Sequence, residues 1–405
     1  MRYDKPRVPN ASKTGGHASA VLAGYLGWTL DAFDFFLVSL CVTAIGSEFH
    51  KSVAEVSATM TLTLLFRPVG AFLFGLMADR YGRRLPLMLD LIFYSVIEVL
   101  SGLAPNFTTF AVLRALFGIG MGGEWGVGAT LAMEKVPPRL RGALSGFLQQ
   151  GYATGNLLAS LCYFTLFGRF GWRPLFFLGG LPALLAIFVR MRVQESEVWQ
   201  KSRASNWSHL WRSVLSHWRL FLYLLVFMTA MNLVAHGTQD LYPVFLERQR
   251  GFGVAGRATL NAISMIGAIA GGTLIGFFSD RAGRRRAIVL ALFAALAMIP
   301  LWAFAPTLTL LVAGAFLMQF FVQGAWGVIP AHLTELSPDS VRGFLPGFGY
   351  QCGAALSGSV ILAEALFARQ TGYGVAMAVT TAVVVIFAVV AAHLGPERKA
   401  ILFGQ

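Results

Sequence analysis

The sequence has few charged residues. Only 13% of its 405 residues are Asp, Glu, Lys or Arg, whereas about a quarter is usual in soluble domains. Hydrophobic residues make up 56% of the chain, and the mean hydropathy is +0.65. This composition excludes an ordinary soluble domain and predicts a polytopic protein whose surroundings are a lipid bilayer.

Cysteine is also scarce. The three cysteines, Cys41, Cys162 and Cys352, each lie in an apolar segment and lack the spacing of a disulfide framework or a metal site. The polar segments contain neither a nucleophile–base pair nor a phosphate-binding glycine loop. We therefore expect no enzymatic activity, no metal and no cofactor.

Acidic residues are outnumbered, with 19 against 32 basic ones and a net charge of +13. Most Lys and Arg residues fall on one side of the apolar segments, which indicates membrane orientation rather than nucleic-acid binding. The rule that cytoplasmic loops are basic then places both termini in the cytoplasm, in a cell inner membrane. No cleavable signal peptide is evident, because the polar start 1–17 leads into a span interrupted by Asp31 and Asp34.

The apolar segments predict twelve membrane-spanning helices. They lie at about 19–44, 56–78, 85–104, 107–133, 143–167, 174–193, 218–247, 257–279, 287–304, 308–334, 344–368 and 372–394. A polar, amphipathic stretch separates the first six from the last six and is expected to lie on the cytoplasmic membrane surface. The predicted domains are 1–194, the linker 195–217, and 218–405.

The two halves repeat. The stretch Gly75–Arg84 returns 201 residues later as Gly276–Arg285, and further matches keep the same offset. These matches include Trp125 with Trp326, Glu134 with Glu335, Arg141 with Arg342, and Gln150 with Gln351. The repeat predicts an all-α fold of two pseudo-symmetric six-helix bundles, with the substrate site between them near the bilayer midplane.

The doubled G-x-x-x-D-R-x-G-R-R loop resembles the signature of the major facilitator superfamily, and the resemblance covers essentially the whole chain. In that family these loops brace the cytoplasmic gate. The resemblance implies that Asp79 and Asp280 pair with cations on neighbouring helices, with Arg141 and Arg342 as the expected partners beside Glu134 and Glu335. Arg83, Arg84, Arg284 and Arg285 are expected mainly to orient the chain. The predicted gating residues are Asp79, Arg83, Arg141, Asp280, Arg284 and Arg342.

The seventh span carries a polar stripe. Asn232, His236 and Asp240 fall on one face of a helix, with Gln239 beside them. Polar groups are costly in hydrocarbon unless they face a bundle interior or a wet cavity. The stripe is therefore a candidate binding or proton-transfer site, or else a polar contact that joins helices.

Other intramembrane charges extend this candidate site. Asp31 and Asp34 share one face of the first span, where they could carry protons or form ion pairs. Asp31 matches Asn232 in the repeat, so the two facing helices would present polar groups at one depth. We expect Arg67 to form a structural pair, and Arg114 to bind a substrate carboxylate because guanidinium is a bidentate carboxylate ligand. Glu124 is a candidate proton relay, and Gln351 could bind substrate or join helices.

Three stretches, Asp31–Phe36, Gly122–Gly126 and Asn232–Asp240, together resemble a narrower family, the sialate/lactate–proton symporters. Asn232–Asp240 is similar to the N-x-x-[S/T]-H-x-[S/T]-Q-D-x-x-x-T motif of monocarboxylate–proton symporters, although Ala235 and Val244 stand where hydroxyl residues are expected. The resemblance implies that His236, Gln239 and Asp240 carry substrate and proton determinants.

The sequence thus predicts proton-coupled symport of a small monocarboxylate, lactate or pyruvate, by a monomer, with the proton as coupling ion. The substrate-binding residues are Arg114, Asn232, His236, Gln239 and Gln351, and the proton-coupling residues are Asp240, Asp34, Asp31 and Glu124. A sialate or aromatic-acid symporter is the nearest alternative, and a carboxylate sensor that does not transport is a further one.

Overall fold

The computed structural model describes residues 14–202 and 206–404, which form helices and their connecting turns. The first bundle contains α1 (Thr14–Phe49), α2 (Val53–Tyr81), α3 (Arg84–Gly102), α4 (Phe107–Lys135), α5 (Arg141–Gln149), α6 (Gly151–Phe170), α7 (Arg173–Leu178) and α8 (Pro182–Arg192). The linker forms α9 (Glu197–Ser202) and α10 (Trp207–Ser216). The second bundle contains α11 (Trp218–Gln239), α12 (Tyr242–Arg248), α13 (Val254–Ala282), α14 (Arg284–Phe304), α15 (Leu308–Leu336), α16 (Leu345–Ser357), α17 (Ser359–Thr371) and α18 (Tyr373–Leu394). Most of the polar start 1–17 lies outside the described residues.

The helices match the twelve predicted spans. Within the described residues, nine segments are long and apolar enough to cross a membrane. The other three predicted spans are the glycine-rich α4 and the interrupted pairs α5–α6 and α16–α17. The all-α, twelve-span prediction is therefore confirmed.

Four spans are broken rather than continuous, which the sequence analysis did not predict. In the seventh span α11 ends at Gln239, and α12 resumes at Tyr242 with Pro243 in its first turn. A proline lacks the backbone donor that a continuing helix needs. The break lies directly beside the polar stripe of α11, at Asp240 and Leu241.

The internal repeat is visible in the packing of equivalent helices. A side chain at Gly70 on α2 would collide with the carbonyl oxygen of Ile119 on α4. A side chain at Gly271 on α13 would collide in the same way with that of Phe320 on α15. Both pairs are related by the offset of 201 residues. Glycine thus allows the same close backbone approach in each bundle.

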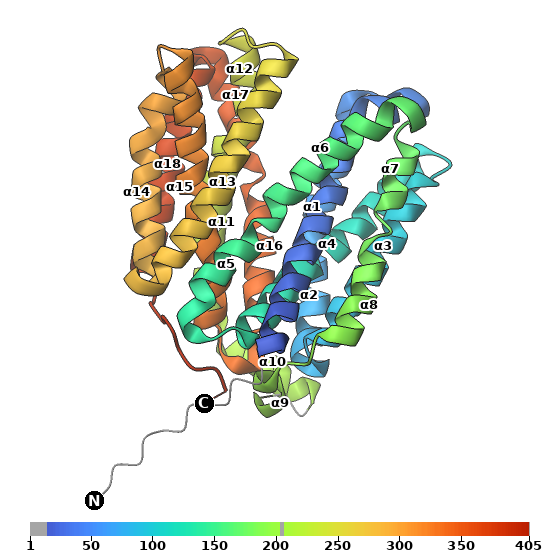
Figure 1. Cartoon of the computed structure of the whole chain (residues 1–405), viewed down its shortest axis with the longest axis vertical. Helices are drawn as coiled ribbons and strands as arrows, with labels where there is room; N and C mark the ends of the chain where they lie inside the picture. Colours follow the sequence, from blue (N-terminus) through green and yellow to red (C-terminus); the bar gives the residue numbers. More distant parts are fainter. Residues whose placement is uncertain (1–13, 203–205, 405) are drawn as a thin grey trace, which may run out of the picture.

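The two bundles are arranged as a V (Figure 1). They lie close together at the end that carries α9 and α10, here named the linker end. They diverge at the end that carries α7 and α12, here named the open end. The start of α1 and the tail after α18 both lie toward the linker end.

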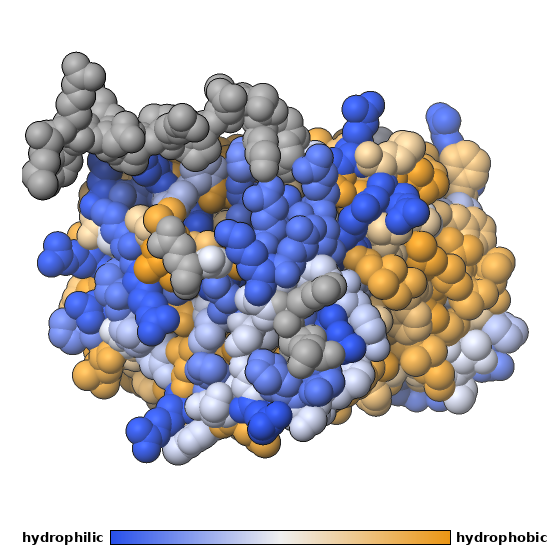
Figure 2. Space-filling model, turned by 90° about the horizontal axis from the view of Figure 1, so that it is seen from below, coloured by the Kyte–Doolittle hydropathy of each residue, from blue (hydrophilic) through white to orange (hydrophobic). Residues whose placement is uncertain are grey.

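The linker packs against both bundles at the linker end. The ring of Trp211 on α10 lies 5.8 Å from that of Phe72 on α2, and the hydroxyls of Ser213 and Ser340 are 2.7 Å apart. Hydrophilic side chains gather over much of this end of the molecule (Figure 2). The linker is therefore a packed connection between the bundles as well as an amphipathic segment.

Candidate functional site

A central cavity lies between the two bundles, and its empty space, including the part open to solvent, is about 720 Å³. Helices of both bundles contribute to its wall, as expected for a site at a repeat interface. The lining residues are Trp28, Phe35, Leu64, Arg67, Met121, Gln149, Tyr152, Asn232, Ala235, His236, Gln239, Asp240, Gln323, Trp326, Tyr350 and Ala354.

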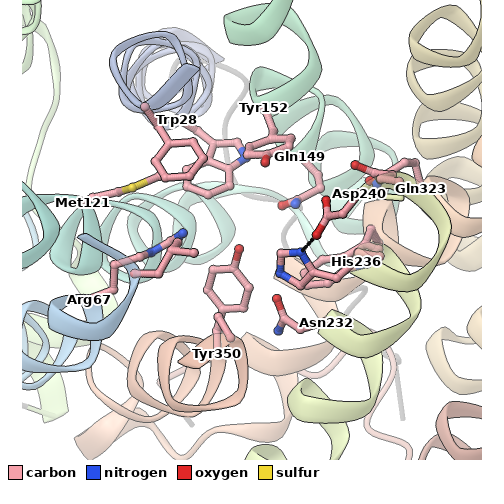
Figure 3. Close-up of a pocket in the computed structure, with 16 residues that line it drawn as sticks. Trp28, Arg67, Met121, Gln149, Tyr152, Asn232, His236, Asp240, Gln323 and Tyr350 are labelled. Atoms are coloured by element: carbon pink, nitrogen blue, oxygen red, sulfur yellow. Dashed lines mark hydrogen bonds and ion pairs between the residues drawn. The ribbon is translucent and has the colours of Figure 1, made fainter. Parts of the chain in front are cut away.

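The polar stripe of α11 faces this cavity, as the sequence predicts. The Nδ1 atom of His236 lies 2.8 Å from Oδ2 of Asp240, one helical turn away (Figure 3). Asn232 donates to the carbonyl of Met228, and Gln239 donates to the side-chain oxygen of Gln319 at 3.0 Å. The stripe is a cavity wall on which an imidazole and a carboxylate are in contact.

Arg67, not Arg114, supplies the positive charge of the cavity. Among the lining residues that the structure describes, Arg67 is the one Lys or Arg. Its guanidinium carbon lies 5.7 Å from the ring centre of Tyr350, and its Nε and Nη2 atoms have no hydrogen-bond partner. Figure 3 shows Arg67 across the opening from His236 and Asp240. The sequence-based expectation that Arg67 forms only a structural pair is wrong.

Arg114 lies inside the first bundle, so its predicted contact with substrate in the cavity is also wrong. Its Nη2 atom is 2.5 Å from a carboxylate oxygen of Glu98 and 2.5 Å from the hydroxyl of Ser101. Its guanidinium carbon is 4.6 Å from the ring centre of Phe117. A buried arginine needs such a counter-ion, because an unpaired buried charge is strongly destabilising.

Three predicted proton-coupling residues lie behind the cavity wall. Asp31, Asp34 and Glu124 are fully buried in the first bundle, and none of their carboxylate oxygens has a hydrogen-bond partner. Arg67 belongs to the same bundle, but neither Asp31 nor Glu124 makes a hydrogen bond to it. Asp31 therefore does not face Asn232 across the cavity, although the repeat relates the two positions.

Gln351 joins helices and does not line the cavity. Its side-chain nitrogen donates at 3.4 Å to the carbonyl of Gly122 on α4, in the other bundle. The cavity is lined instead by the preceding residue, Tyr350, and by its repeat partner Gln149. Consecutive residues on a helix point about 100° apart. The sequence analysis used the repeat pair Gln150–Gln351, which lies one position after Gln149–Tyr350 and therefore on a different helix face.

The aromatic wall of the cavity was missed by the sequence analysis. The rings of Trp28 and Tyr152 are stacked, with centres 5.6 Å apart, and Tyr350 packs on Trp125 at 4.5 Å. In an apolar span such residues cannot be told from lipid-facing ones by composition. The one sequence signal for this aromatic wall is the repetition of Trp125 as Trp326. In the structure both tryptophans contact Tyr350.

A second hollow continues the cavity toward the open end. It shares Tyr152, Gln239 and Asp240 with the central cavity and reaches Arg257, whose guanidinium lies 2.5 Å from Glu247. The central site is thus reached from the open end.

The linker end is closed by two reciprocal contacts between the bundles. Asp79, at the end of α2, accepts hydrogen bonds from the backbone N–H groups of Gly343 and Phe344 at 2.8 and 3.0 Å. Asp280, its repeat partner, accepts from those of Gly142 and Ala143 at 2.8 and 2.9 Å. Each carboxylate therefore caps a helix start of the opposite bundle.

The ion partners of these two carboxylates differ from the prediction. Arg83 pairs with Asp79 and Arg284 pairs with Asp280, each at 2.8 Å, and neither aspartate pairs with Arg141 or Arg342. Both Arg83 and Arg284 are completely buried, so a role limited to chain orientation is excluded for them.

Two glutamates complete the network. Glu134 pairs with Arg83 at 3.1 Å and with Arg342 of the other bundle at 3.6 Å. Glu335 pairs with Arg284 at 2.9 Å and with Arg141 of the other bundle at 3.5 Å. Burial opposes the charge of Arg83, but Glu134 and Asp79 outweigh it and hold the Arg83 pKa above its usual value.

The sequence profile of the Major Facilitator Superfamily matches residues 24–271 and 241–401, most of the chain. The protein belongs to the Major Facilitator Superfamily. As a member of this family it is a multi-pass membrane transporter and not an enzyme.

Similar proteins support the assignment. The chain is 28% identical to a carboxylic acid transporter protein homolog of Saccharomyces cerevisiae, over 93% of this chain and 67% of that protein. It is 29% identical to the sialic acid transporter NanX of Escherichia coli, over 89% and 90%. The solved proton:xylose symporter XylE superposes with a TM-score of 0.76 at 18% identity, covering 96% and 98% of the two chains, which shows the shared superfamily fold.

Proposed function

We propose that this protein is a proton-coupled symporter of a small monocarboxylate, with lactate or pyruvate as the first candidates. The observation that carries the proposal is the position of Arg67 across the central cavity from the His236–Asp240 pair. One arginine suits one carboxylate group, because its guanidinium can donate two parallel hydrogen bonds to it. Amide groups of Asn232 and Gln239 stand beside the space and are suited to the polar remainder of the substrate.

Coupling follows from competition for Arg67. Asp31 and Glu124 are buried without hydrogen-bond partners in the same bundle as Arg67, and in this proposal they are the carboxylates that compete for it. When these carboxylates are charged, they hold the guanidinium; when they are protonated, it is free to bind the substrate anion. Asp240 provides the proton site on the other wall, where His236 can receive or return the proton. Substrate and proton would therefore load together, and no cofactor is required.

The structure corresponds to the outward-facing state in this proposal. The positive-inside rule assigns the linker end, and both termini, to the cytoplasm of the inner membrane. The cavity, reached from the open end, then faces outward. One chain supplies both walls of the site, so a monomer is sufficient for alternating access.

An aromatic or unsaturated acid is the second candidate, and the cavity wall favours it. The rings of Trp28, Tyr152 and Tyr350 surround the space beside Arg67 (Figure 3). Flat apolar substrates gain from stacking on such rings, whereas lactate has little surface to stack.

Uptake into proteoliposomes tests both candidates. With radiolabelled lactate and an inward proton gradient, we expect accumulation that disappears when the gradient is abolished. Competition by unlabelled pyruvate, benzoate and sialate then ranks the substrates. Stronger competition by benzoate than by pyruvate would favour the second candidate, and binding without accumulation of any acid would contradict symport.

A further inference from the structure

The tail that follows α18 contacts both bundles at the linker end. Its first part is fixed to the second bundle: Glu397 accepts from the backbone N–H groups of Arg284 and Arg285 at 3.1 and 2.8 Å. The amine of Lys399 donates at 2.6 Å to the carbonyl of Arg281. The tail therefore starts from a firm anchor at the beginning of α14.

Beyond this anchor, the tail enters the ionic network of the linker end. The backbone N–H of Ala400 donates to Glu335 at 3.2 Å, and that of Gly404 donates to Asp339 at 2.8 Å. Ala400 has a φ of 57°, a left-handed conformation that costs free energy in a residue other than glycine. The contacts of the segment offset this cost.

The ring of Phe403 is held between one arginine of each bundle. The guanidinium carbon of Arg141 lies 3.6 Å from the ring centre, and that of Arg342 lies 3.8 Å from it. At such short distances each cation must stand over a ring face, and two guanidiniums on one face would collide. Phe403 is therefore stacked between the two cations and screens one from the other.

Of the two arginines that contact Phe403, Arg141 belongs to the first bundle. Besides its contact with Phe403, its Nη1 atom donates to the carbonyl of Ile401 at 2.7 Å. If the bundles separate at the linker end, the tail stays with its anchor on the second bundle. Its contacts with Arg141 must then break.

We propose that the contacts of Ala400, Ile401, Phe403 and Gly404, named here the tail clasp, hold the linker end closed, with Phe403 as the residue that positions Arg141 against Arg342. The clasp must release Arg141 each time the linker end opens. It sets the balance between the two states of the transporter, whichever substrate is carried.

The test measures a distance between the bundles in the full chain without substrate. Spin labels at Leu140 and Arg286, both exposed, report opening of the linker end when the three native cysteines are replaced by alanine. In Phe403→Ala we expect the ratio of open to closed molecules to rise about tenfold, in the range that loss of a ring–cation contact produces. Phe403→Trp should retain the closed distance.

A neighbouring substitution supplies the matched control. Leu402 is 59% exposed in the same segment, so Leu402→Ala should leave the distance distribution unchanged. An unchanged distribution in Phe403→Ala, or an equal shift in Leu402→Ala, would overturn the proposal. If Phe403→Ala is not monodisperse, Phe403→Leu replaces it, because leucine removes the ring but keeps apolar volume. An unchanged distance distribution in Phe403→Leu, or an equal shift in Leu402→Ala, would then overturn the proposal. The measurement uses no substrate, so its failure is distinct from failure of the symport proposal.

Discussion

At the scale of single residues, the proposed function makes Arg67 the main determinant of substrate binding in this cavity. Arg67→Gln removes the charge and both parallel donors, and hydrogen bonds to charged groups contribute about 1.5–3 kcal/mol. We expect the half-saturation concentration for uptake to rise about 10- to 100-fold. Arg67→Lys keeps the charge but cannot donate two parallel hydrogen bonds. Its half-saturation concentration should lie between those of Arg67→Gln and the wild type.

Arg219 provides the control for this series, because it is exposed at the start of α11 and distant from the cavity lining. Arg219→Gln should leave uptake unchanged. Wild-type half-saturation in Arg67→Gln would remove Arg67 from the site.

Asp240 is the one carboxylate among the described lining residues of the central cavity. Asp240→Asn keeps the shape and one acceptor toward His236 but cannot carry a proton. We expect the variant to lose accumulation driven by a pH gradient while it still exchanges substrate at equal concentrations. Wild-type accumulation by Asp240→Asn would transfer the coupling role to the buried carboxylates Asp34, Asp31 and Glu124.

These residues show what the sequence could and could not reveal. The stripe on α11 was predicted because helical periodicity fixes which residues share a face. The roles of Arg67 and Arg114 were exchanged, because both are isolated arginines in apolar spans. Their difference lies in a tertiary partner: Glu98 neutralises Arg114 but is 16 positions away and carries no sequence signal of pairing.

At the scale of helices, the reciprocal caps made by Asp79 and Asp280 join the ends of α2 and α13 to helix starts of the opposite bundle. Asp79→Ala or Asp280→Ala should cost the closed state about 1 kcal/mol, the usual effect of losing a cap. Because neither residue lines the cavity, we expect the maximal transport rate to fall much more than the substrate affinity.

Asn106 caps α4 within the first bundle, where its side-chain oxygen accepts from the N–H of Thr109 at 2.9 Å. Asn106→Ala therefore removes a cap of similar strength that does not cross between bundles. It should slow transport less than either aspartate variant. A large loss of affinity with an unchanged maximal rate in Asp79→Ala would contradict the gating assignment.

Helix existence was predictable from hydropathy, but helix continuity was not. The breaks between α5 and α6 and between α16 and α17 fall within apolar runs that carry no helix-breaking proline. The break after α11 has a local cause in Pro243, and the break between α7 and α8 has one in Pro182. The other two depend on packing between the bundles, which the sequence does not display.

At the scale of the whole molecule, the duplicated architecture was predictable because a constant offset over many positions leaves little choice of fold. The proposed cycle makes one prediction at this scale. A monocarboxylate anion and one proton together carry no net charge, so a 1:1 cycle is insensitive to membrane potential, which acts at about 2.3 kcal/mol per charge per 100 mV.

We therefore expect a potassium/valinomycin potential, imposed at equal pH, to drive no accumulation of lactate in proteoliposomes. An inward gradient of one pH unit should support roughly tenfold accumulation. Uptake driven by potential alone would show that more than one proton accompanies each anion.

The linker-end network divides evenly between the two halves of the molecule. The first bundle contributes Asp79, Glu134, Arg83 and Arg141, and the second contributes Asp280, Glu335, Arg284 and Arg342. Each set of four sums to zero charge, and Asp339, which pairs with Arg342 at 2.5 Å, adds one negative charge to the second bundle. Opening the linker end separates the pairs Glu134–Arg342 and Glu335–Arg141, but every carboxylate of the two sets keeps an arginine of its own bundle. Because these pairs are buried, salt screens them weakly, and we expect the opening equilibrium to respond little to ionic strength.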